Sequence, residues 1–247
     1  DGLRHRRLRS RREEGLPSSP ELVDAGDARG ERLWEAAGRS QLRNERLRES
    51  LVVQSHPAFC GLATAATVLR SFGLERSEQG VLDCLDDAFP DTWYAHWGIP
   101  AADALPARLK LRLLRGVLQY DGLPVAAVRA LLDGHGLTSV AVMPGCMEEL
   151  AGCLREALGS GGREVLVLNY GRRSVGQRGT GHFAPVAALA EGHALALDTN
   201  SWRYPSCWIP LPLLWSALCE RTPNGARRGC LRVSLSPSGP EGAGRKK

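Results

Sequence analysis

Hydrophobic residues recur at helical spacing in the first half of the chain. Leu62, Ala65, Ala66 and Leu69 follow the i, i+3, i+4, i+7 pattern, which predicts a helix with one apolar face. This helix begins at or next to Cys60. Apolar residues at helical spacing, or a glycine that closes an apolar segment, predict three further helices at residues 27–37, 124–136 and 147–159.

The second half of the chain has the pattern of β-strands. Short apolar runs are separated there by glycine-rich or polar turns. Helices followed by an antiparallel sheet make the α+β arrangement, in which two lobes can face each other across a cleft. We therefore expect an α+β fold, with a helical lobe that carries the Cys60 helix and faces an antiparallel β-sheet lobe. The predicted strands are residues 138–143, 164–170, 182–190, 193–199 and 229–235.

The positive charge of the chain is concentrated at its two ends. The formal net charge is +5, but residues 1–12 hold six arginines and residues 241–247 hold three basic residues. A nucleic-acid-binding surface needs basic residues on a folded face, so we expect no nucleic acid partner. We expect residues 1–26 to be a disordered basic segment, residues 27–235 to be one catalytic domain, and residues 236–247 to be a disordered tail.

The cysteines indicate a reducing compartment. Seven cysteines form an odd set without a CxxC pair, which argues against a disulfide framework and against a zinc ribbon. We expect a cytoplasmic protein, with organelle targeting through the arginine-rich start as the minority interpretation. No apolar run approaches the ~20 residues that a bilayer span requires, so no membrane partner is expected.

Cys60 has the setting of a reactive thiol. The start of a helix places positive potential on the side chain there, which stabilises a thiolate. His182 begins a predicted strand and Asp198 ends the next one, so a hairpin can set the carboxylate against the imidazole. The amide of Gln54, six residues before Cys60, could donate to an oxyanion together with the Cys60 backbone N–H. The order Gln, Cys, His, Asp is a papain-type layout.

Each of these residues also has an ordinary explanation when taken alone. A cysteine at a helix start is more often a small buried residue, a histidine on a strand is more often held by backbone groups, and an aspartate after a strand commonly begins a turn. Their combination favours a catalytic triad of Cys60, His182 and Asp198. The other six cysteines lie mostly in apolar patterns and keep the ordinary interpretation.

Three stretches resemble the phytochelatin synthase family, also called glutathione γ-glutamylcysteinyltransferase. They are QSHPAFCGLATAATVL at 54–69, GQRGTGHFAPV at 176–186 and ALDTNSWRYPSCWIPLPLLW at 196–215. Weaker similarity extends over most of residues 16–235. The resemblance implies a papain-like catalytic domain in which Cys60 is the nucleophile, His182 the base, Asp198 the orienting acid and Gln54 the oxyanion donor.

The resemblance also implies a substrate and its contacts. The substrate would be glutathione, whose Cys–Gly amide is cleaved to give a γ-Glu-Cys thioester on Cys60. Cadmium or zinc would stimulate transfer while held by the substrate thiolates, so we expect metal–glutathione thiolates as partners, no cofactor and no metal site on the protein. A homodimer is possible. The implied substrate contacts are Asn169, Arg172, Gly181 and Arg228.

The chain departs from the family's pattern near the substrate cleft. His56 replaces an acidic residue, Ser201 stands where an arginine is usual, Ser206 breaks a usual Pro-Pro, and residues 86–122 have the pattern of an insertion. These departures leave the triad intact, so they affect substrate specificity more than reaction class. A papain-fold peptidase or deamidase that acts on another γ-glutamyl or small peptide substrate is therefore the alternative hypothesis.

Overall fold

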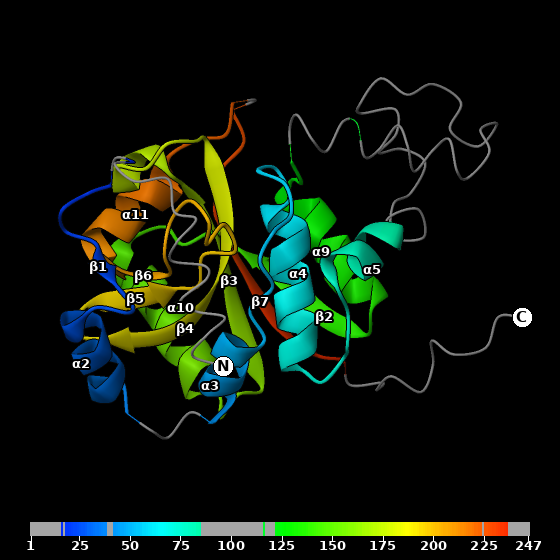
Figure 1. The fold of residues 1–247 in the computed structure, drawn as a ribbon, viewed down its shortest axis with the longest axis horizontal. Coiled ribbons are helices and arrows are strands. Elements are labelled where there is room, and N and C mark those ends of the chain that lie inside the picture. The colour runs from blue at the N-terminus through cyan, green and yellow to red at the C-terminus, as the bar shows by residue number, and fades with distance from the viewer. Residues whose placement is uncertain are drawn as a thin grey trace, which may run out of the picture.

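The structure is a computed structural model that describes residues 16, 18–38, 42–84, 116, 122–223 and 225–236. Its centre is a seven-stranded antiparallel sheet with the order β1-β6-β5-β4-β3-β7-β2 (Figure 1). The strands are β1 Val23–Asp24, β2 Leu137–Val142, β3 Glu164–Gly171, β4 Gly181–Ala190, β5 His193–Ala196, β6 Cys207–Pro210 and β7 Gly229–Leu235.

Helices cover both faces of this sheet. On one face, α2, α3, α4 and α9 share a core with every second residue of the strands, such as Val165 and Val167 of β3. The intervening residues, such as Leu166 and Leu168, pack with α10 and α11 on the other face. The helices are α2 Ala28–Ala36, α3 Leu42–Glu49, α4 Cys60–Ser71, α5 Glu78–Asp83, α9 Val125–Gly134, α10 Met147–Gly159 and α11 Leu211–Cys219.

Helix α4 packs tightly because its side chains are small. Nearly all of its residues are buried, and a Cβ at Gly61 would lie 2.9 Å from a methyl group of Val128 in α9. The hydroxyl of Thr64 donates to the carbonyl of Phe183 in β4 at 3.1 Å. This bond lies four residues after Cys60 and one residue after His182. The helix is therefore fixed against β4 close to both residues.

The α+β fold is confirmed, with the Cys60 helix packed against an antiparallel sheet. Helix α10 matches its predicted bounds, and the other predicted helices and strands agree to within three residues. The sequence patterns missed β1, β6 and α11, as well as the short helix α3. Figure 1 shows α11 on the left of the view and α4, α5 and α9 gathered on the right; α4 and α9 belong to the core on one face of the sheet and α11 to the core on the other.

The folded region begins earlier than the predicted boundary at residue 27. Val23 and Asp24 form β1 and pair with Trp208 and Cys207, and the Ser19 N–H donates to the Val175 carbonyl at 3.1 Å. Residues 1–15 and 17 of the predicted disordered segment, almost all of the predicted insertion at 86–122 and the predicted tail after residue 236 lie outside the described residues. In the described ranges, no helix is long and apolar enough to cross a membrane.

Candidate active site

The fold brings Cys60, His182 and Asp198 together. Cys60 is the first residue of α4 and is buried. It is hydrogen-bonded to the His182 side chain. His182 lies in β4, and its Nε2 is 2.8 Å from Oδ1 of Asp198. Because Nε2 faces the carboxylate, Nδ1 is the ring nitrogen left for the thiol.

The β4–β5 hairpin positions the imidazole against the carboxylate. β4 pairs with β5, and the Leu197 N–H continues the pairing by donating to the Pro185 carbonyl at 2.9 Å, just before Asp198. A bulge between Val186 and Ala188 shifts the register within the hairpin. The His182 ring also lies against Tyr170, edge to face, with centroids 5.7 Å apart. The hairpin predicted from the spacing of His182 and Asp198 is thus present.

The charges in this site favour a thiolate–imidazolium pair. Burial raises the pKa of Cys60, but the hydrogen bond and charge of His182, the Phe183 backbone and the charge of Arg172 outweigh it and lower the pKa overall. Burial and Arg172 lower the pKa of His182, whereas Asp198 and the bond to Cys60 raise it more. The thiol is therefore acidic and the imidazole basic relative to their ordinary values.

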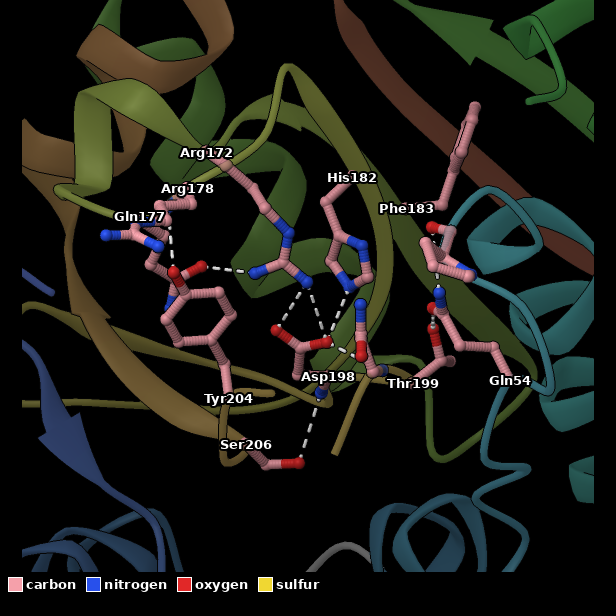
Figure 2. Close-up of polar contacts among 12 residues, drawn as sticks. Gln54, Arg172, Gln177, Arg178, His182, Phe183, Asp198, Thr199, Tyr204 and Ser206 are labelled. Atoms are coloured by element: carbon pink, nitrogen blue, oxygen red, sulfur yellow. Dashed lines mark hydrogen bonds and ion pairs between the residues drawn. The ribbon is translucent and has the colours of Figure 1, made fainter. Parts of the chain in front are cut away.

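Asp198 stays ionised despite complete burial. Burial raises its pKa, but Arg172, His182 and the Asn200 N–H hold that pKa far below the ordinary range. The Asn200 N–H donates to Oδ1 at 2.8 Å, and the Asp198 N–H donates to the Ser206 hydroxyl at 3.1 Å. Figure 2 shows the carboxylate between His182 and Arg172. Asp198 can therefore fix the tautomer and orientation of His182.

Gln54 is adjacent to the nucleophile, but its amide has protein partners. Nε2 donates to the carbonyls of His56 at 2.8 Å and Pro57 at 3.0 Å, and Oε1 accepts from the Thr199 hydroxyl at 2.9 Å. The side chain thus links the segment before α4 to the segment after Asp198 (Figure 2). Donation to an oxyanion would require one of the two Nε2 bonds to be exchanged, and the role of Gln54 as oxyanion donor stays a prediction.

Three of the four predicted substrate contacts lie together beside the triad. Arg228 donates from Nη1 to the Asn169 side chain at 3.3 Å and from Nη2 to the Thr180 carbonyl at 3.2 Å. A Cβ at Gly181 would overlap the Arg228 guanidinium, so only glycine leaves room there. Nε of Arg228 is buried and has no hydrogen-bond partner among the described residues. Arg228 also faces the negative charge of the Cys60 thiolate.

Arg172, the fourth predicted contact, pairs with Asp198. Its Nη2 lies 2.8 Å from Oδ2 and 2.9 Å from Oδ1 of Asp198, and its side chain is 5% exposed. Sequence patterns also missed Thr64, which fixes α4 against β4, and Thr199, which holds the Gln54 amide. A hydroxyl within an otherwise apolar helix was the available signal for Thr64. Over the described ranges, no three His, Cys, Asp or Glu residues lie close enough to hold a metal ion.

The site predicts selective alkylation of Cys60 at mildly acid pH. Ordinary thiols near pKa ~8.5 are protonated there, whereas His182 keeps the pKa of Cys60 low. Burial and the charge of Asp198 raise the pKa of Cys207 to about 12, so that thiol should not react. We expect iodoacetamide at pH 6 to label Cys60 first, as located by peptide mass mapping. Labelling of the exposed Cys219 before Cys60 would contradict an activated thiolate.

Two solved structures share part of the architecture at low similarity. One is a double glycine motif protease from an AMS/PCAT transporter in complex with its leader peptide, with a TM-score of 0.41, 13% identity and coverage of 75% of this chain and 91% of that one. The other is the peptidase domain of Streptococcus ComA, with a TM-score of 0.44, 12% identity and coverage of 76% and 97%.

Curated relatives match along most of this chain. Glutathione gamma-glutamylcysteinyltransferase 1 of Triticum aestivum is 28% identical over 91% of this chain, and its namesake in Lotus japonicus is 29% identical over 89%. The enzyme of Schizosaccharomyces pombe is 23% identical over 70%. The chain spans 43%, 41% and 38% of the lengths of these relatives. The model of the family described as phytochelatin synthase matches residues 13–230, and the chain therefore belongs to the phytochelatin synthase family.

Proposed function

We propose that this protein transfers the γ-glutamylcysteinyl group of glutathione through a thioester on Cys60. The observation that carries the proposal is the buried contact series from Cys60 to His182 to Asp198, in which the pKa of the thiol is lowered and that of the imidazole is raised. Family membership and the names of the relatives support glutathione as the donor. Acyl transfer in heavy-metal detoxification is then the role that fits best.

The reaction has two steps, and His182 gives up a proton in the first and accepts one in the second. The Cys60 thiolate attacks the carbonyl carbon of the Cys–Gly amide, the C–N bond breaks, and the His182 imidazolium gives its proton to the departing glycine amine. The amine of a second glutathione then attacks the thioester, His182 accepts the proton, and the Cys60 thiolate is released. Attack by water instead gives γ-Glu-Cys. Asp198 supports the imidazolium in both steps.

The substrate-binding groups follow from the charges beside the triad. Nε of Arg228 is a buried donor without a partner among the described residues, so we assign Arg228 to a substrate carboxylate, with Asn169 as its neighbour and Gly181 as the position that leaves the space. We assign cadmium or zinc to the substrate thiolates, as metal–glutathione complexes that serve as substrate. We place the protein in the cytoplasm, whose reducing conditions would keep Cys60 reactive. We also propose that it associates as a homodimer.

Product analysis tests the proposed donor and the fate of the thioester. We expect the purified, reduced protein to release glycine from glutathione and, with cadmium, to form peptides longer by one γ-Glu-Cys unit, both measured by mass spectrometry. Glycine without peptide extension would assign hydrolysis instead. No glycine from a protein whose Cys60 is still alkylated selectively would remove glutathione as the donor and favour a peptidase or deamidase acting on another small peptide.

A further inference from the structure

The Arg172 side chain lies between the carboxylate of Asp198 and the loop that joins β3 to β4. While Nη2 contacts both oxygens of Asp198, Nη1 donates to the side-chain oxygen of Gln177. The guanidinium carbon lies 5.0 Å from the centroid of the Tyr204 ring. Both terminal nitrogens therefore have protein partners, and a tyrosine ring lies near the guanidinium (Figure 2).

The β3–β4 loop is shaped around this arginine. The Arg172 carbonyl accepts from the N–H groups of Val175 at 3.2 Å and Gln177 at 2.9 Å. Gly179 has a φ of +119°, and a Cβ there would lie 3.2 Å from Cδ of Arg172. The Tyr204 hydroxyl accepts from the Arg178 N–H at 2.7 Å, which ties the aromatic ring to the same loop. The loop thus holds Arg172 in one place against Asp198.

Asp198 is shared between Arg172 and His182. Oδ1 accepts from the Asn200 N–H at 2.8 Å and lies 2.8 Å from Nε2 of His182, while Oδ2 faces Arg172 at 2.8 Å. A buried carboxylate needs paired donors on both oxygens to remain ionised. Without the arginine, Oδ2 would lose that ion pair. The Asp198 carboxylate would then be held toward His182 by fewer contacts.

We propose that Arg172 is a positioning residue, which holds Asp198 ionised and turned toward His182, and that it does not contact the substrate. The proposal rests on the catalytic roles given above to Cys60, His182 and Asp198, but not on the identity of the donor. Reactivity of Cys60 toward a small neutral alkylating agent can therefore test the proposal without glutathione. If glutathione proves not to be the donor, that test still applies.

Loss of Arg172 should move thiolate formation to higher pH for two reasons. Burial raises the pKa of Cys60, and the opposing charge of Arg172 would be gone. In addition, a displaced or protonated Asp198 would support the His182 imidazolium less. Loss of the Arg172 charge would also remove a lowering of the His182 pKa, which opposes these two changes, so an upward shift at Cys60 means that the lost support of Asp198 and the lost charge near the thiol outweigh it. The other titratable or charged side chains that face these groups are Tyr170 of β3, Cys207 of β6, which itself faces Asp24 of β1, and Arg228 before β7.

The test compares the pH dependence of iodoacetamide alkylation at Cys60 in Arg172→Met and in Arg173→Met. The control removes the same charge from the exposed neighbouring residue. In Arg172→Met, we expect the acid limb of the plot of alkylation rate against pH to move to higher pH by at least about one unit. Alkylation at pH values below that limb should then be about tenfold slower. Arg173→Met should keep the wild-type profile. Arg172→Lys should recover part of the shift, because it restores charge without the planar pair of donors.

Two results would overturn the proposal. One is an unchanged alkylation profile in Arg172→Met together with a raised KM for the donor, which is the signature of a substrate contact. The other result concerns a second variant, Gln177→Leu, which is used if Arg172→Met does not fold. Gln177→Leu keeps the arginine but removes the partner of Nη1. A folded Gln177→Leu variant should show a smaller upward shift. No shift in that variant would reject the positioning role.

Discussion

Cys60→Ala should release no glycine from glutathione and should form no acyl-enzyme. Cys60 is the thiol that α4 places against His182, and its pKa is lowered. By contrast, burial raises the pKa of Cys207 and of Cys230 to about 12. Neither of these two buried cysteines therefore shares the setting of Cys60. Glycine and the mass of the intact protein after acid quenching measure the two effects.

Cys153→Ala is the matched control for this substitution. It removes a thiol from α10, on the sheet face opposite α4, and should leave glycine release at the wild-type rate. Thermal unfolding of both variants checks that the fold is kept. Glycine release by folded Cys60→Ala at more than a trace rate would reject the thioester mechanism, and an acyl group found on another residue would identify the true nucleophile.

His182→Ala should lower both the reaction rate and the acidity of the nucleophile. General acid–base catalysis contributes typically 10²–10⁴-fold, so the turnover rate should fall by about that factor. Burial raises the pKa of Cys60, and His182 is the main group that opposes it, so the thiolate should form only at higher pH. Alkylation of Cys60 as a function of pH measures this shift separately from turnover. The acid limb should move upward.

His193→Ala is the control for a lost imidazole. His193 begins β5 and is only partly buried, with Nδ1 near the Glu191 carbonyl at 2.8 Å, so its loss should leave the alkylation profile unchanged. Alkylation of His182→Ala with the wild-type pH profile would mean that the helix start alone activates Cys60. In that case His182 would act only on the leaving group.

Local sequence patterns predicted the elements that carry the triad. The apolar spacing of α4 and the apolar runs of β4 and β5 are visible in the sequence, because nearly all of their residues are buried. β6 and α11 were missed for a physical reason. Residues 207–219 are a nearly continuous apolar run in which a strand passes into a helix at Pro210. Neither the two-residue period of a strand nor the 3.6-residue period of a helix is therefore clear.

The partners of the triad were harder to predict than the triad itself. The pairing of Arg172 with Asp198 joins residues from different strand ends, and nothing in the spacing of either residue specifies it. The resemblance to a family identified Arg172 as a residue of the site but gave it a substrate role. The orientation of the Gln54 amide likewise depends on the carbonyls of His56 and Pro57, which become acceptors only when the chain turns before α4.

The hydrogen bond from Thr64 to Phe183 fixes the spacing of nucleophile and base without involving the predicted substrate contacts. It couples the first turns of α4 to the residue after His182, so the spacing of nucleophile and base depends on how a helix sits on a strand. Asn169 and Arg228, two of the predicted substrate contacts, lie outside that helix–strand contact. Substitutions there can therefore redirect substrate choice within a lineage while the sulfur chemistry is inherited unchanged.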